Sequence, residues 1–176
     1  KFIEQFKVST HKIASALVTN LELVKEVANC KKYTFISTGM CELEDVDKVV
    51  EIFKKANCDF ELMHSVSTYP ADEKDLNLSL IDFYKKRYNC KVGYSGHEPS
   101  ISPSVIAAAL GASSIERHIT LNRSLFGTDQ SASVERRGLT ELVNVVRKIP
   151  IVVGVPQKKM LDAEKPIAKK MRYWIK

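Results

Sequence analysis

Short β-prone runs alternate with amphipathic segments along most of the chain. Five runs rich in apolar and β-branched residues predict strands at His11–Ser15, Tyr33–Ser37, Phe60–Val66, Lys91–Tyr94 and Ser114–Ile119. Apolar residues at helical spacing predict helices at Leu21–Ala28, Glu44–Lys55, Leu78–Tyr88, Ser104–Leu110 and Leu139–Lys148. Strand and helix alternate about every 20–30 residues, a rhythm typical of βα units in a parallel sheet.

Polar side chains gather where the predicted strands end. Right-handed crossovers bring the carboxyl ends of parallel strands to one edge, which carries the ligand site in barrels and in open α/β sheets. The residues at these ends are Lys12, Ser15, Ser37, Thr38, Ser65, Ser67, Ser95, His97, Glu116 and His118. Because polar residues occur at the equivalent end of all five predicted strands, a ligand site is favoured over a coincidence of packing. The sequence contains neither GxGxxG nor GxxxxGK[ST], which argues against nucleotide binding of those kinds.

Two histidines are the strongest candidates for metal ligands. His97 and His118 follow consecutive strands at equivalent positions, so their imidazoles can converge. Two neutral imidazoles with open positions suit a divalent cation such as Mn²⁺ or Zn²⁺ that acts as a Lewis acid. Taken singly, each histidine is explained as well or better by a half-buried structural imidazole. His11 and His64 have similar but weaker claims.

Other polar residues predict a binding pocket for an anion and a sugar. Lys12 lies among the hydroxyls of the strand ends, which suits phosphate or carboxylate, although it can also be a surface lysine whose alkyl chain covers apolar surface. Asp129 lies in a loop of turn residues after the fifth strand and can bind sugar hydroxyls or cap a turn. Tyr69 and Pro70 can line the pocket or fix their loop.

Composition narrows the class of protein. Apolar residues make up 44% of the chain and charged residues 27%, which are ordinary values for a globular domain. The four cysteines form no CxxC pair, so we expect reduced thiols and a cytoplasmic location. The longest apolar stretches are too short to span a bilayer. A net charge of +6 favours anionic ligands, and the basic carboxyl terminus is expected to be a solvated face because no nucleic-acid motif accompanies it.

Several motifs together resemble one family, the sialic acid synthases, which comprise N-acetylneuraminate synthase and its relatives for other nonulosonic acids. The motifs are KIAS at 12–15, STGM at 37–40, Ser67–Pro70, GYSGHEPSI at 93–101, ALGASSIERHITLNR at 109–123 and GTDQSAS at 127–133. Their order and spacing match along nearly the whole chain. GYSGH followed by ERHITL is a highly specific pair.

The resemblance implies a fold, a reaction and a set of site residues. Such enzymes are (β/α)₈ barrels that condense phosphoenolpyruvate with N-acetylmannosamine or a similar 2-acetamido sugar and release phosphate. They use a divalent metal, typically Mn²⁺, with Mg²⁺, Co²⁺ or Zn²⁺ as alternatives. His97 and His118 match the metal ligands, and with Lys12 they are the expected catalytic residues. The positions that match phosphoenolpyruvate contacts are Lys12, Ser15, Ser37, Ser67 and Ser95. Tyr69 and Asp129 match contacts to the acceptor sugar.

The chain departs from the family pattern in three ways. Leu17 stands where the family usually has a carboxylate. From the resemblance we expect the chain to begin at the fourth strand of the barrel, with Lys1–Val8 as the end of a helix, and to lack the common antifreeze-like domain. We therefore expect five carboxyl-terminal βα units of a barrel over residues 1–150, a helical extension over 151–176, and a piece of a longer chain.

These departures leave alternatives open. The chain can be a catalytically inactive barrel fragment with a structural or binding role, or part of another synthase that condenses phosphoenolpyruvate with an aldose. We expect a homodimer that binds neither nucleic acid nor membrane.

Overall fold

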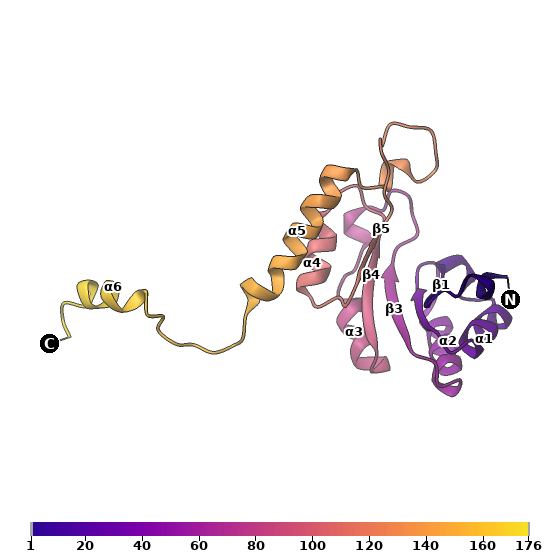
Figure 1. Cartoon of the computed structure of the whole chain (residues 1–176), viewed down its shortest axis with the longest axis horizontal. Helices are drawn as coiled ribbons and strands as arrows, with labels where there is room; N and C mark the ends of the chain where they lie inside the picture. The colour runs from indigo at the N-terminus through magenta and orange to yellow at the C-terminus, as the bar shows by residue number, and fades with distance from the viewer. Residues whose placement is uncertain (1, 176) are drawn as a thin grey trace.

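A computed structural model describes residues 2–175 as a five-stranded parallel sheet that curls into half of a barrel, with helices on its outer side (Figure 1). The strands are β1 (Thr10–Ile13), β2 (Tyr33–Ser37), β3 (Phe60–Ser65), β4 (Lys91–Gly96) and β5 (Ile115–Arg117). Each strand pairs with its neighbours in the sequence, in the order β1-β2-β3-β4-β5. The prediction of five βα units from a (β/α)₈-type barrel is confirmed.

Six helices and four short 3₁₀ turns complete the fold of residues 2–175. The helices are α1 (Leu21–Asn29), α2 (Leu43–Lys55), α3 (Leu80–Tyr88), α4 (Ser102–Ala109), α5 (Arg136–Val153) and α6 (Glu164–Met171). The turns are η1 (Ile3–Phe6), η2 (Ser15–Leu17), η3 (Glu73–Asp75) and η4 (Gln130–Ala132). Side chains fix some of the helix starts: Asn20 caps α1 by accepting from the Leu23 amide, and Glu42 and Asp45 form a capping box at α2.

The hydrophobic core lies between the sheet and the helices. Because side chains alternate along a strand, each of the first four strands sends at least one fully buried apolar residue outward to the helices. These residues are Ile13, Ile36, Leu62 and Val92, and each is at most 1% exposed. They pack in one cluster with the inward faces of the helices, which include Val24, Val49, Phe53 and Ile81. Burial of this cluster is the main term that stabilises the half-barrel.

The inner face of the sheet is polar near the carboxyl ends of the strands. The strand register aligns Ser65 with Ser95 and Ser95 with Glu116 across β3, β4 and β5. Lower in the barrel, the buried carboxylate of Glu61 accepts hydrogen bonds from Tyr33 at 2.7 Å and from Ser113 at 2.7 Å. The inner face therefore holds a layer of serines and Glu116 near the carboxyl ends of the strands. Below this layer lies the Glu61 carboxylate with its hydrogen-bond donors.

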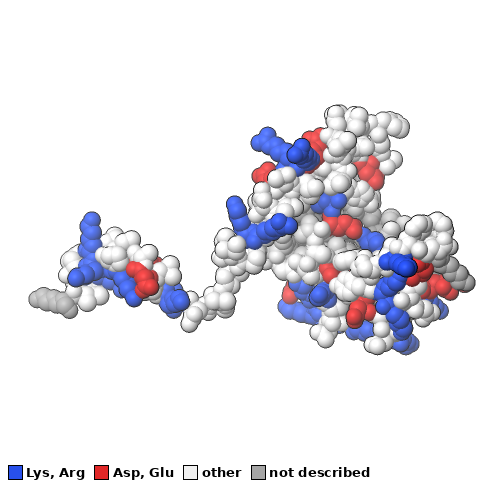
Figure 2. Space-filling view, viewed as in Figure 1, with Lys and Arg blue, Asp and Glu red and all other residues white. Residues whose placement is uncertain are grey.

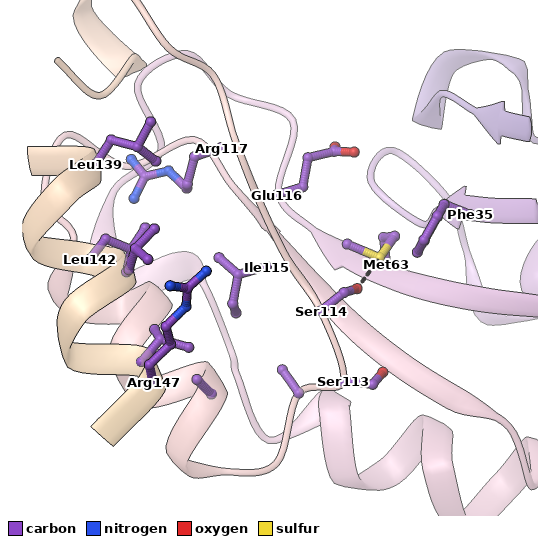
Figure 3. Close-up of a pocket in the computed structure, with 14 residues that line it drawn as sticks. Phe35, Met63, Ser113, Ser114, Ile115, Glu116, Arg117, Leu139, Leu142 and Arg147 are labelled. Carbon is purple, nitrogen blue, oxygen red and sulfur yellow. Dashed lines mark hydrogen bonds between the residues drawn. The ribbon is translucent and has the colours of Figure 1, made fainter. Parts of the chain in front are cut away.

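Both outer strands of the described sheet have an open edge. β1 pairs only with β2, and β5 pairs only with β4. A cleft of about 660 Å³ runs along the open edge of β5 and reaches the apolar side of α5. Figure 3 shows Ile115 and Arg117 on the side of this cleft that faces Leu139 and Leu142 of α5. Glu116 lies on the opposite side of the strand, so β5 separates the outer packing from the inner face.

Some predicted boundaries were wrong. Ser15 belongs to η2 and not to the first strand, and β5 has three residues where six were expected. β4 continues to Gly96, so its last residues lie closer to the ligand edge. α5 spans Arg136–Val153 and runs through Pro150, so it begins before and ends after the expected helix at Leu139–Lys148. The segment expected to end a helix forms only the 3₁₀ turn η1.

The carboxyl-terminal segment leaves the half-barrel after Gly154. Figure 1 shows an extended stretch that ends in α6, away from the sheet. Lys165, Lys169 and Lys170 lie on this helix, and Figure 2 shows basic side chains gathered there. All of Gly154–Lys170 except Ala168 is exposed. Within residues 2–175, no helix combines the length and the apolar character that a membrane span needs.

Candidate functional site

The two predicted metal ligands lie side by side at the carboxyl ends of β4 and β5. The ring centroids of His97 and His118 are 5.1 Å apart, and the rings are inclined by 71°. His97 directly follows β4, and His118 directly follows β5. The backbone carbonyl of His118 accepts from the Val134 amide at 2.8 Å, which ties the end of β5 to the segment that precedes α5. The structure therefore brings together the pair that the sequence predicts.

His97 is held as a neutral imidazole with one nitrogen available. Its Nδ1 lies 2.7 Å from the carbonyl oxygen of Val66, so this nitrogen carries the proton and donates it to that oxygen. Burial lowers the pKa of His97, and the hydrogen bond to Val66 only partly offsets this effect. The lone pair of Nε2 therefore remains free at neutral pH. A backbone acceptor on the second nitrogen is the usual way to orient a metal-binding histidine.

Tyr69 and Asp129 flank the two imidazoles. The ring of Tyr69 lies 4.3 Å from that of His97 and 5.6 Å from that of His118, measured between centroids. Asp129 Oδ2 lies 3.4 Å from His118 Nδ1. Both residues come from loops, after β3 and after β5. The structure thus gathers the predicted sugar contacts around the histidine pair.

A second cluster on the inner face joins β1 and β5, the two edge strands of the sheet. Lys12 Nζ of β1 lies 2.6 Å from both carboxylate oxygens of Glu116 on β5, and Ser95 Oγ donates to Glu116 at 2.8 Å. Burial raises the pKa of Glu116, but the hydrogen bonds from Lys12 and Ser95 outweigh it and hold this pKa below its usual value. Lys12 therefore points into the half-barrel and not along the surface, and Glu116 is a carboxylate.

Serine hydroxyls crowd around Gly39 at the end of β2. The Gly39 amide donates to Ser15 Oγ at 3.1 Å. A methyl group added at Gly39 would lie 2.1 Å from Ser67 Oγ and 2.9 Å from Ser15 Oγ, so only glycine leaves room for this arrangement. Ser67 Oγ is buried and has no hydrogen-bond partner among residues 2–175. Ser37, buried at the end of β2, lies beside the same turn. An unsatisfied hydroxyl in a cradle of this kind fits an anion's oxygen atoms.

A buried ion pair anchors both histidine-bearing segments. Glu98 follows His97, Arg117 precedes His118, and Glu98 Oε1 accepts from Arg117 Nη1 at 3.0 Å, with side chains 0% and 2% exposed. Glu98 also accepts from the Tyr94 hydroxyl at 2.8 Å. Arg117 further donates to the carbonyl oxygens of Ser100 and Ala132. This network links the ends of β4 and β5 to the loop that carries Asp129.

A family model for the NeuB family matches residues 1–158. The chain belongs to the NeuB family. Human N-acetylneuraminate-9-phosphate synthase is 37% identical over 165 residues, which cover 93% of this chain and 46% of that protein. N,N'-diacetyllegionaminic acid synthase of Legionella pneumophila is 34% identical over 171 residues, covering 94% and 48%. The chain thus spans about half the length of the curated relatives it matches, and the resemblance to sialic acid synthases is confirmed.

A solved structure supports the same family assignment. The N-acetylneuraminic acid synthetase of Leptospira borgpetersenii serovar Hardjo-bovis, solved in complex with citrate, superposes with a TM-score of 0.86 at 33% identity. The match covers 98% of this chain and 61% of that one. The two curated relatives named above are synthases of N-acetylneuraminate-9-phosphate and of N,N'-diacetyllegionaminic acid.

In this NeuB member, the histidine pair suits a divalent cation but supplies only two ligands. Imidazole nitrogens bind Mn²⁺, Co²⁺ and Zn²⁺, and His97 keeps a free lone pair. Within residues 2–175, this pair belongs to no group of three possible ligand atoms that all lie within 4.8 Å of one another. The donors fit such a cation if water, substrate or groups outside this chain complete the coordination.

The other two histidines lie elsewhere. His64 faces outward from β3, where its Nε2 lies 2.6 Å from the carbonyl oxygen of Leu76 and its ring packs near Tyr84 and Tyr94. Burial lowers the pKa of His64, as expected for a neutral structural imidazole. His11 pairs with Glu4 on the outer face of β1. Neither residue reaches the site on the inner face.

Glu116 is the site residue that the sequence reasoning missed. It was recognised as a polar strand end but received no role, although it stands two residues before His118, the spacing at which side chains of an extended segment point to the same side. Leu17, at the position of the missing carboxylate, is 44% exposed and belongs to η2. Glu116 is the carboxylate that contacts Lys12 and Ser95 in this chain.

Proposed function

We propose that this chain is the carboxyl-terminal half of a barrel that condenses phosphoenolpyruvate with a 2-acetamido sugar, such as N-acetylmannosamine, to give a nonulosonic acid and phosphate. One observation carries the proposal. A lysine, a carboxylate and a cradle of hydroxyls share the carboxyl-terminal edge of the half-barrel with two converging imidazoles. Such an arrangement matches a small, highly charged anion beside a carbonyl group that needs to be polarised.

Lys12 and the serines would bind phosphoenolpyruvate. The substrate carries about three negative charges, so its phosphate and carboxylate compete with Glu116 for the Lys12 ammonium. Ser15, Ser67 and the Gly39 turn supply neutral hydrogen-bond groups of the kind that bind phosphate oxygens without adding charge. Ser37 and Ser95 extend this row of hydroxyls towards β4.

Glu116 would act as the base at the same site. Release from Lys12 leaves a partly exposed carboxylate whose pKa rises, because the hydrogen bond that lowered it is lost. In the reaction, C3 of phosphoenolpyruvate forms a bond to the aldehyde carbon, and the carbonyl electron pair moves to the aldehyde oxygen. Water adds at C2 and gives up a proton, and the aldehyde oxygen takes up a proton. The bond between C2 and the phosphate oxygen then breaks, and inorganic phosphate leaves with the proton of the C2 hydroxyl, so that C2 becomes a ketone. Glu116 would accept the proton of the water, a role that Leu17 cannot perform.

The acceptor sugar would lie between the histidine pair and the loops. Tyr69 can stack on the sugar ring, and Asp129 can accept hydrogen bonds from its hydroxyls. A divalent cation held by His97 and His118, for which Mn²⁺ is our first choice, would polarise the aldehyde oxygen. Tyr69 and Asp129 therefore determine which sugar is accepted, while Lys12 and the serines recognise the common substrate.

Phosphate release tests the proposal. The assay measures phosphate from phosphoenolpyruvate with a panel of 2-acetamido sugars and with simple aldoses, with and without a chelator. It is run on the 176-residue chain and on any longer natural protein in which this sequence occurs. We expect metal-dependent release with at least one 2-acetamido sugar. Release with simple aldoses alone would favour the other class of condensing synthase, and no release from the longer protein would favour an inactive fragment.

Matched variants locate the activity. His97→Ala, His118→Ala and Lys12→Met should each abolish metal-dependent release in the active protein. Lys91→Met is the control, because Lys91 is an exposed lysine at the opposite end of β4. Full activity in both histidine variants would overturn the metal assignment.

A further inference from the structure

Three possible metal ligands meet on the outer side of β1, away from the site described above. They are Glu4 of η1, His11 of β1 and Cys30, which caps the carboxyl end of α1. One ligand atom from each lies within 4.8 Å of the other two. Because neighbouring residues on a strand face opposite ways, His11 lies on the face opposite Lys12. The cluster is therefore separate from the inner-face site.

Two buried atoms of this cluster face each other. Glu4 Oε1 and His11 Nε2 lie 2.8 Å apart, and the His11 side chain is only 10% exposed. Beyond this contact, neither atom has a hydrogen-bond partner among residues 2–175. Both atoms offer lone pairs when the imidazole carries its proton on Nδ1. Either a proton on Nε2 or a cation bound by both atoms then holds the pair together.

We propose that Glu4, His11 and Cys30 form a binding site for a borderline divalent cation, with Zn²⁺ as the best match. Zn²⁺ takes carboxylate oxygen, imidazole nitrogen and thiolate sulfur together, usually with four ligands, and water can supply the fourth. With bond lengths of about 2.0–2.3 Å, tetrahedral ligand atoms lie about 3.3–3.6 Å apart. In the structure, Glu4 Oε1 and His11 Nε2 lie 2.8 Å apart and the Cys30 sulfur lies within 4.8 Å of a ligand atom of each residue, so side-chain rotations bring the three atoms to these separations.

The surroundings of the cluster are compatible with this geometry. Lys32 Nζ contacts Glu4 Oε2 at 2.6 Å and leaves Oε1 facing His11. The hydrogen bond from Lys32 lowers the pKa of Glu4, so the carboxylate is charged. The Cys30 thiol donates to the Glu26 carbonyl oxygen at 3.3 Å, and its proton passes to solvent when the cation binds. The bound cation then links η1, β1 and α1.

Cobalt spectroscopy tests the site on the 176-residue chain under reducing conditions. Co²⁺ substitutes for Zn²⁺, and a thiolate ligand adds an intense charge-transfer band in the near ultraviolet. We expect this band to reach its maximum at one Co²⁺ per chain and to be displaced by Zn²⁺. Cys30→Ser should remove the band, and His11→Gln should weaken Co²⁺ binding by about tenfold or more. Circular dichroism checks that each variant is folded.

Two controls separate this site from the others. Cys90→Ser changes another partly buried thiol and should leave the band unchanged. The double variant His97→Ala/His118→Ala should also keep the band, because the inner-face pair contains no thiol. Absence of the band, or its persistence in Cys30→Ser, would overturn the proposal and leave an ion-pair network only. If Cys30→Ser does not fold, Zn²⁺ should still protect Cys30 more than Cys90 from alkylation in the unchanged chain, and equal rates would overturn the site.

Discussion

The ion pair between Glu98 and Arg117 offers the sharpest test of how the candidate site is supported. Both side chains are almost fully buried, at 0% and 2% exposure. Arg117→Met removes the cation and leaves the Glu98 carboxylate buried, with hydrogen bonds from only Tyr94 and Ser104. Loss of one member of a buried pair costs about 3–5 kcal/mol. We therefore expect the free energy of unfolding to fall by about that amount.

A double-mutant cycle separates the interaction from the cost of each change. Glu98→Leu with Arg117→Met removes both charges, so no buried charge is left without a partner. Replacing a buried pair by apolar groups is often close to neutral, although Tyr94 and Ser104 then lose an acceptor. The double variant should therefore be no less stable than either single variant, with an interaction energy of about 3 kcal/mol.

Urea unfolding followed by circular dichroism measures these free energies. The exposed pair Glu51 and Lys55, 2.5 Å apart on α2, is the control, and Glu51→Gln should cost about 0.5 kcal/mol or less. A loss below about 1 kcal/mol in Arg117→Met, or a double variant whose loss equals the sum of the singles, would refute this account of the network.

Three further predictions concern the titrating and hydroxyl groups. Burial lowers the pKa of His97 and of His64. Their contribution to stability is therefore complete above the unfolded pKa of about 6.5, and it is lost as the pH falls through their folded pKa values. Urea unfolding should show a free energy of unfolding that decreases from pH 7 to pH 5, and a flat profile would contradict this prediction. Lys12→Met should raise the pKa of Glu116, because burial then acts without the hydrogen bond from the lysine. Carbon-13 NMR of labelled glutamate measures this pKa. An unchanged pKa would mean that Lys12 does not control this carboxylate. Gly39→Ala should raise the KM for phosphoenolpyruvate about ten- to a hundredfold by displacing Ser67 Oγ, whereas an unchanged KM in a steady-state assay would place the phosphate elsewhere.

Local patterns in the sequence were sufficient to predict the fold and part of the site. Alternating strand and helix patterns located all five strands. The positions of His97 and His118 at strand ends predicted that the two residues lie side by side. The contacts that were missed join residues far apart in the chain. Lys12 and Glu116 are separated by 104 positions, and nothing in either local pattern shows that they meet across the half-barrel.

The same limit explains two other misses. Glu98 and Arg117 both stand inside recognised motifs, yet their pairing depends on two strands being neighbours and on both residues being buried. The end of β5 could not be located from propensity, because the apolar residues after Arg117 continue the β-prone pattern into a loop. There the chain leaves the sheet to reach Val134, and this tertiary contact overrides local preference.

The register of β1, an edge strand, determines the position of two functional candidates, Lys12 and His11. This strand has only four residues and one partner, and its outward Ile13, which is 1% exposed, is what fixes its alignment with β2. A slip by one residue would turn every side chain to the opposite face. Lys12 would then leave Glu116 for the helix layer while His11 left Glu4 for the inside of the half-barrel. A single folding error in this short strand would therefore disable both chemical sites at once.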